Sequence, residues 1–130
     1  MSFASQPPAP AQSIQVVFPD GLVGLPSLVG FTLATVPETA LYELLSRDEP
    51  AFGVVLARAD DIRPGMSEAL GARGLVDASD DLLVILAVHG EPPAVTANLA
   101  GPIVLGTDGE ARQLVLEDPD YPLRAPVAAG

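Results

Sequence analysis

Short apolar runs broken by glycine, proline and aspartate recur along this chain and restrict what it can fold into. Runs of this length between turn-forming residues are typical of β-strands. The pattern predicts strands at residues 13–18, 30–35, 40–46, 52–58, 82–89, 95–99, 103–105 and 112–117. Asp108-Gly109 is the clearest hairpin turn, because glycine readily adopts the positive φ that such turns need. One short helix is expected over residues 67–72, with Ser67 as its cap.

Many short strands in a 130-residue chain favour antiparallel pairing, because the sequence lacks the repeated helical crossovers that join parallel strands. Closing the sheet would remove its exposed edges. We therefore expect a mainly all-β fold, a small antiparallel β-barrel-like single domain over residues 13–130. Residues 1–12 include Pro7, Pro8 and Pro10 and are expected to form a flexible N-terminal arm.

The net charge of the chain limits the kinds of partner that it is expected to bind. Seventeen acidic residues against six arginines and no lysine give a net charge of −11. Phosphate contacts need clustered basic side chains, so direct nucleic-acid binding is not expected. An acidic surface can serve solubility alone, or it can speed encounter with a basic partner. With no secretion signal and no apolar run near the ~20 residues of a membrane helix, we expect a soluble, cytoplasmic monomer.

Few residues could support catalysis. His89 is the single histidine and the chain has no cysteine, which excludes Cys-His catalysis and multi-histidine metal sites. Asp60-Asp61 and Asp80-Asp81 are adjacent pairs, and neighbours on extended backbone point to opposite faces. We interpret both pairs as solvated charge. The sequence thus predicts no enzymatic activity, no cofactor and no metal, and a His89→Ala variant would test this expectation.

Two unusual segments remain as candidates for a binding surface. Residues 18–26 form an apolar loop expected to face solvent, and exposed apolar groups often mark a partner site. The alternative is that this loop plugs an open end of the barrel. Residues 96–105 place an amide, a glycine and a proline inside apolar runs, where strands usually avoid glycine and proline. The predicted partner-binding residues are Pro19, Leu22, Val23, Leu25, Asn98, Leu99 and Pro102.

Two points stay open. Asn98 is expected either to hydrogen-bond to a backbone carbonyl that Pro102 leaves unpaired or to contact a partner directly. The alternative function is a β-barrel that holds an apolar or acyl ligand in its interior, which a filled core would remove. The predicted lining of that cavity is Val54, Leu56, Ile85 and Val104.

Several segments, in order, resemble the FliW family of flagellar assembly factors. Residues 18–24 are similar to the family's F-P-x-G-hydrophobic-x-G motif, and residues 45–52 to its strand–turn–strand. Residues 96–104 resemble the segment T-A-N-L-x-x-P-I-V, and residues 112–116 with 121–124 resemble the closing strand and tail. The chain departs from the family pattern at Leu25-Pro26, where the family usually has phenylalanine, and over residues 4–12 and 58–81.

The resemblance implies a small β-barrel-like protein without enzymatic activity. Proteins of this family bind flagellin in the cytoplasm and also bind the translational regulator CsrA. When secretion depletes flagellin, the freed factor captures CsrA and relieves repression of flagellin mRNA. An acidic protein has the right sign of charge to approach the basic RNA-binding surface of such a regulator.

Overall fold

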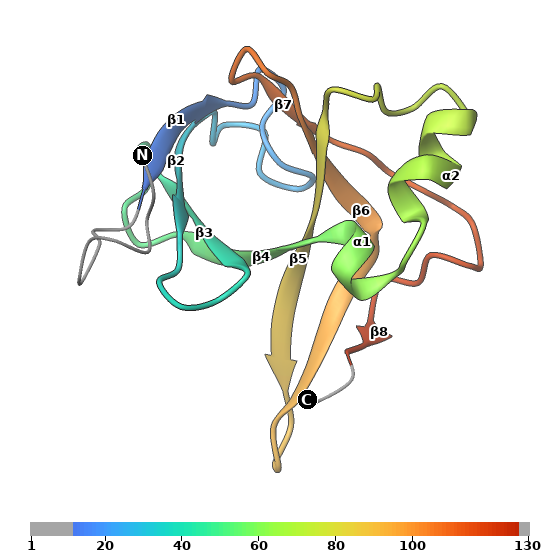
Figure 1. Ribbon diagram of the computed structural model, residues 1–130. Coiled ribbons are helices and arrows are strands. Elements are labelled where there is room, and N and C mark those ends of the chain that lie inside the picture. The colour runs from blue at the N-terminus through green and yellow to red at the C-terminus, as the bar shows by residue number, and fades with distance from the viewer. Residues whose placement is uncertain (1–11, 128–130) are drawn as a thin grey trace.

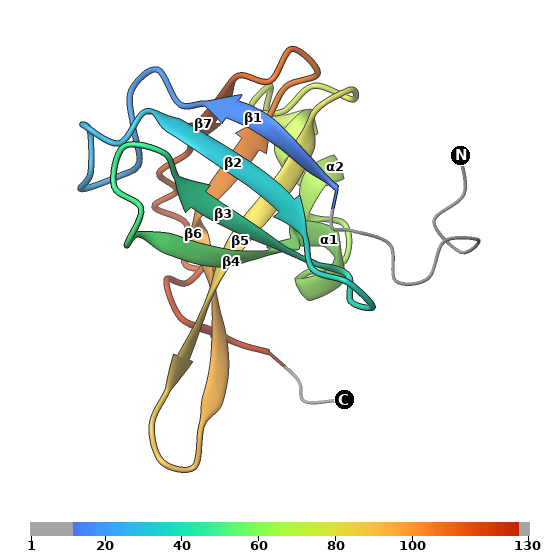
Figure 2. The same cartoon turned by 90° about the vertical axis from the view of Figure 1, so that its left-hand side faces the viewer.

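Successive strands pair with one another and curl into a nearly closed antiparallel barrel (Figure 1; Figure 2). The structure is a computed structural model and describes residues 12–127. The strand order is β1-β2-β3-β4-β5-β6-β7, and β8 pairs with β6. The strands are β1 Ser13–Val17, β2 Gly30–Thr35, β3 Leu41–Ser46, β4 Gly53–Arg58, β5 Asp81–His89, β6 Ala94–Leu105, β7 Ala111–Gln113 and β8 Ala125–Pro126. The expected barrel-like all-β architecture is confirmed.

The barrel is closed at one point and open beyond it. Val17 N–H donates to the Gly109 carbonyl at 3.0 Å, where β1 ends and the turn before β7 lies. Val17 and Glu110 form a parallel bridge there, and no further pairing joins β1 to β7 in the described residues. We call this gap between β1 and β7 the seam. Residues 19–26, which follow β1, come close to the end of β7, where Val23 N–H donates to Gln113 Oε1.

Successive side chains of β5 belong to two different hydrophobic clusters. Leu83 points into the barrel, whereas Leu82 and Val84 point outward. The cluster inside the barrel consists of Val16, Phe18, Leu22, Phe31, Leu33, Leu44, Leu56, Leu83, Ile103, Leu105 and Ala111. The outer cluster lies under the helices and the C-terminal segment, which cover the outer side of β5 and β6 (Figure 1). Both faces are therefore buried over residues 82–84 of β5 and 101–105 of β6, whereas the hairpin end of the two strands is exposed.

The sequence predicted one helix, and the described residues contain two. α1 (Ala59–Ile62) is a single turn that ends at Arg63, because the residue before Pro64 is held in an extended conformation. α2 (Met66–Ala72) begins after Gly65, which is left-handed at φ 85°. Ser67 is not the cap: its own N–H donates to Asp60 Oδ1 at 2.9 Å. Asp60 of α1 thus caps α2 from outside.

The Asn-Gly-Pro segment is a bulge within β6 rather than the turn expected between two strands. Val84 on β5 lies opposite four residues of β6, because Leu83 pairs with Ile103 and Ile85 with Asn98. On its other side, β6 pairs with β7 beyond this bulge and with β8 before it. Residues 99–102, which we call the β6 bulge, allow the strand to change partners. This explains glycine and proline inside an otherwise regular strand.

Other boundaries also differ from the prediction. β7 is shorter than the expected strand 112–117, although Leu114 and Leu116 still donate to β6 carbonyls at 2.8 Å and 2.7 Å. β8 had no signal in the sequence. Residues 1–11 of the predicted arm lie outside the described residues, and Gln12 is hydrogen-bonded to Thr35, extending the β1–β2 pair.

Candidate functional site

The two segments selected from the sequence meet at the seam. A hollow of about 380 Å³ opens there, between the 19–26 loop, the β6 bulge and the residues that follow β7. We call it the seam hollow. Its lining is Leu22, Val23, Leu25, Phe52, Ile85, Asn98, Ala100, Gly101, Gln113, Leu114, Val115, Leu116 and Leu123. None of these side chains is charged, in a chain with a net charge of −11.

Gln113 connects the walls of the hollow. Val23 N–H donates to Gln113 Oε1 at 2.8 Å, and Gln113 Nε2 donates to the Gly101 carbonyl at 2.9 Å. Gly101 N–H in turn donates to Asn98 Oδ1 at 2.9 Å. A single chain of hydrogen bonds therefore runs from the loop to the bulge. Asn98 does bond to backbone, as one of the two alternatives predicted, but to an N–H rather than to a carbonyl.

A tight turn at the loop tip decides which apolar residues are exposed. Leu22 and Leu25 exchange backbone hydrogen bonds of 3.2 Å and 2.8 Å. Gly21 and Gly24 have φ of 70° and 81°, and a Cβ on Gly21 would lie 2.5 Å from Pro26 Cα, so only glycine fits there. Leu22 is consequently buried in the barrel, while Val23 and Leu25 are 60% and 38% exposed. The loop both plugs the barrel and presents apolar surface.

The seven predicted contact residues divide between surface and core. Pro19, Val23 and Leu25 are exposed, and Asn98 is partly exposed in the seam hollow. Leu99 and Pro102 are fully buried, and Leu22 is nearly so. The expectation that Leu99 and Pro102 offer contact surface is therefore corrected: the bulge turns both side chains into the core.

Other lining residues had no clear signal in the sequence. Gln113, Val115 and Leu123 reach the hollow only because β7 pairs with β6 beyond the bulge, residues 114 and 116 bond to the bulge, and the C-terminal segment folds back along β6. Val115 and Leu123 are 69% and 63% exposed. Single exposed apolar residues are common on protein surfaces, and it is their grouping around one hollow that matters here.

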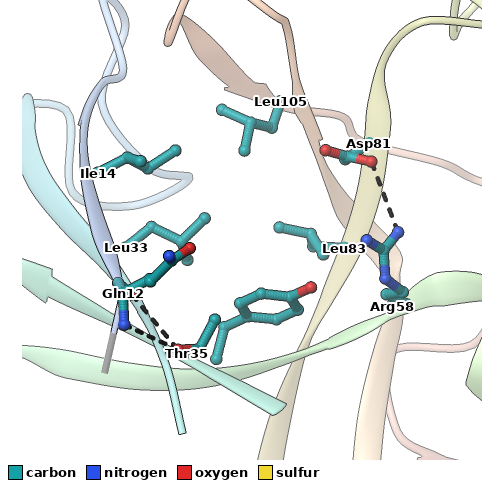
Figure 3. Close-up of a pocket in the computed structure, with 9 residues that line it drawn as sticks. Gln12, Ile14, Leu33, Thr35, Arg58, Asp81, Leu83 and Leu105 are labelled. Carbon is teal, nitrogen blue, oxygen red and sulfur yellow. Dashed lines mark hydrogen bonds and ion pairs between the residues drawn. The ribbon is translucent and has the colours of Figure 1, made fainter. Parts of the chain in front are cut away.

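The interior cavity of the alternative function does not form from the predicted residues. Leu56, with Val54 and Ile85 packed against its cluster, lies inside the barrel, whereas Val104 belongs to the outer cluster. A separate cavity of about 180 Å³ lies at an open end of the barrel (Figure 3). Its lining is Gln12, Ile14, Leu33, Thr35, Tyr42, Arg58, Asp81, Leu83 and Leu105, with 3.5 Å between Arg58 Nη1 and Asp81 Oδ1.

Asp60 and Asp80 of the acidic pairs have structural roles, and His89 lies at the end of a strand. Asp60 caps α2, and Asp80 accepts the Asp77 N–H at 3.0 Å within the turn before β5.

His89 ends β5 opposite Ala94 in the β5–β6 hairpin, and its Nε2 has no hydrogen-bond partner among residues 12–127. In the same residues, no group of three or more histidine, aspartate or glutamate side chains could hold a metal ion. No helix of residues 12–127 is long and apolar enough to span a bilayer.

The fold and the hollow define a class: a small β-barrel protein with an uncharged apolar hollow at the seam of the barrel. The sequence model of one family, described as FliW protein, matches residues 8–127. The chain belongs to the FliW family, whose members are flagellar assembly factors.

Individual relatives agree with this assignment. Flagellar assembly factor FliW 2 of Desulfotalea psychrophila is 33% identical over 125 residues, covering 86% of this chain and 79% of the relative. Flagellar assembly factor FliW of Leptospira biflexa is 28% identical over 116 residues, covering 82% and 76%. A crystal structure of the flagellar assembly factor FliW shares the fold, with a TM-score of 0.70, 24% identity and coverage of 88% of this chain and 86% of that one.

Proposed function

We propose that this chain is a non-enzymatic, cytoplasmic flagellar assembly factor that binds flagellin and antagonises a CsrA-type translational regulator. It acts by partner exchange as a monomer. While flagellin is abundant the factor is occupied, and when secretion depletes flagellin the free factor captures the regulator and releases flagellin mRNA from repression. Membership of the FliW family makes flagellar assembly the setting of this role.

The observation that carries the proposal is the seam hollow. Two segments about 75 residues apart, the 19–26 loop and the β6 bulge, meet there and leave exposed apolar side chains without a cover from the described residues. The net charge of −11 supports the second partner, since a basic regulator is drawn toward an acidic protein. The two partners would thus be recognised by different chemistry.

Calorimetry with purified flagellin and a purified CsrA-type protein tests the proposal at two salt concentrations. We expect a complex with each partner, and affinity for the regulator should fall with added salt because exposed charges are screened. Flagellin added to the complex with the regulator should displace the regulator. The proposal fails if neither partner forms a complex, and partner exchange fails if both bind independently.

A further inference from the structure

The seam leaves one strand edge without a partner. Leu114 N–H donates to the Pro102 carbonyl and Leu116 N–H to the Ala100 carbonyl, so residues 114 and 116 face β6. In an antiparallel pair, backbone groups of alternate residues point to opposite sides. The N–H and C=O of Gln113 and Val115 therefore point away from β6, and no strand of the described residues pairs with them. We call this the β7 edge.

The β7 edge borders the seam hollow. Gln113 and Val115 themselves line the hollow, together with exposed Val23 and Leu123. An extended segment placed along this edge would direct every second side chain toward the hollow, because side chains alternate along a strand. Backbone hydrogen bonds and an apolar side-chain pocket would then be available to the same segment. These are the two elements of recognition by strand addition.

The lack of charged residues in the hollow indicates which kind of segment it can hold. A charged side chain buried there would lose its hydration, and the lining offers no counter-ion. The basic surface of a CsrA-type regulator needs carboxylates, which lie elsewhere on this protein. An uncharged, apolar segment therefore matches the hollow, and a basic segment does not.

We propose that the β7 edge accepts an extended, uncharged segment of flagellin as an added strand, and that the hollow holds an apolar side chain of that segment. This inference rests on the proposed function, because flagellin is the partner assigned there. The main-chain hydrogen bonds are made by Gln113 and Val115, and the 19–26 loop forms the opposite wall. Because the regulator is assigned to surfaces elsewhere, partner exchange requires that flagellin bound at the β7 edge weakens binding of the regulator through a coupling between the two sites.

Two measurements on the full chain test the inference. In the first, backbone amide exchange is compared between the free protein and its complex with intact flagellin. We expect exchange at Gln113 and Val115 to slow at least tenfold in the complex, while amides of the β5–β6 hairpin change little. The second compares Val115→Pro, which removes the outward N–H, with Val115→Ala, which keeps it. We expect Val115→Pro to weaken flagellin binding at least tenfold, and clearly more than Val115→Ala, which shortens the side chain at the hollow but keeps the N–H.

The possible outcomes distinguish failure of this inference from failure of the proposed function. If the unmodified chain does not bind flagellin, both the inference and the proposed function are overturned. If flagellin binds but leaves the β7 edge amides exchanging as before, only the inference is overturned. Protection of this edge by the CsrA-type regulator instead would overturn the choice of occupant. Amide exchange on the unmodified chain decides the matter even where Val115→Pro disturbs folding, which circular dichroism would detect.

Discussion

Gln113 Oε1 lies 2.8 Å from Val23 N, so a side chain near the end of the chain anchors the loop that follows the first strand. The same amide donates to the Gly101 carbonyl, and both bonds are lost together when the amide is removed. We expect Gln113→Leu to lower the free energy of unfolding by about 1–2 kcal/mol, since a part-buried carbonyl then lacks its donor. Urea denaturation measures this loss.

Gln113→Glu is the matched control. It keeps an acceptor for Val23 N–H but replaces the donor to Gly101 with a carboxylate oxygen, which repels the carbonyl. If both variants unfold like the unmodified chain, Gln113 does not join the loop to the bulge.

A second prediction concerns Gly101. A Cβ at this position would lie 2.7 Å from Gln113 Nε2 and 2.9 Å from Asn98 Nδ2, so both amides would have to move. We expect Gly101→Ala to destabilise the protein by about 1 kcal/mol, because moving the two amides disturbs their hydrogen bonds to the Gly101 backbone. Gly71→Ala is the control, because that glycine lies in α2 and its Cβ would meet only the Val76 carbonyl at 3.4 Å. There alanine should be neutral or stabilising by up to ~1 kcal/mol. The midpoint of thermal unfolding should fall for Gly101→Ala and should stay unchanged or rise for Gly71→Ala.

The strands could be predicted from the sequence because their signals are local. The pattern of short apolar runs and turn-forming residues predicted β2 with its observed bounds and placed most other strands within a few residues of theirs. The helices were harder, since α1 is a single turn and α2 is capped by Asp60 from a different element. Nothing in the sequence next to Ser67 reveals that contact.

The site could be predicted only in part, for the same reason. The loop and the Asn-Gly-Pro segment stand out locally because strands avoid such residues. Which side chains they expose depends on pairing across the whole chain: the β6 bulge buries Leu99 and Pro102, and β7 brings Gln113 beside Val23. Those long-range pairings have no local signal.

The burial of Leu99 gives the third prediction. Its side chain is 0% exposed within the outer cluster, so Leu99→Ala should leave a cavity and cost about 2–5 kcal/mol of stability. Val115→Ala, at a side chain that is 69% exposed, should change stability by less than about 0.5 kcal/mol. Equal stabilities would show that Leu99 is not a core residue.

Asp48 gives a prediction for acid pH. The N–H groups of Gly30 and Val29 donate to Asp48 Oδ2 at 3.0 Å and 2.9 Å, and these bonds hold the pKa of the carboxyl below its ordinary value of 3.8. A carboxyl with a lowered pKa in the folded state stabilises fully above its unfolded pKa. That stabilisation is lost as the pH falls from 3.8 through the lowered value.

The measurement is the midpoint of thermal unfolding from pH 7 to pH 2 for Asp48→Asn and the unmodified chain. Asparagine keeps an acceptor but has no charge, so the midpoint of the variant should be lower at pH 7, and the difference should shrink below pH 4. Asp61→Asn, at an exposed position in α1, controls for the general loss of a negative charge. A difference that stays constant with pH would contradict the role of the Asp48 carboxylate.

The last prediction separates binding from stability at the seam hollow. Leu123 is 63% exposed and lines the hollow, whereas Val88 is 67% exposed on the β5–β6 hairpin and does not. A carboxylate introduced at position 123 would lose hydration when an apolar segment docks, so Leu123→Glu should weaken flagellin binding at least tenfold. Val88→Glu adds the same charge to a surface of similar exposure and should change the affinity less than about threefold. Both variants should unfold within about 0.5 kcal/mol of the unmodified chain, because neither side chain is buried. Calorimetry with flagellin checks the pair, and equal weakening by both variants would show that net charge, rather than the hollow, governs the interaction.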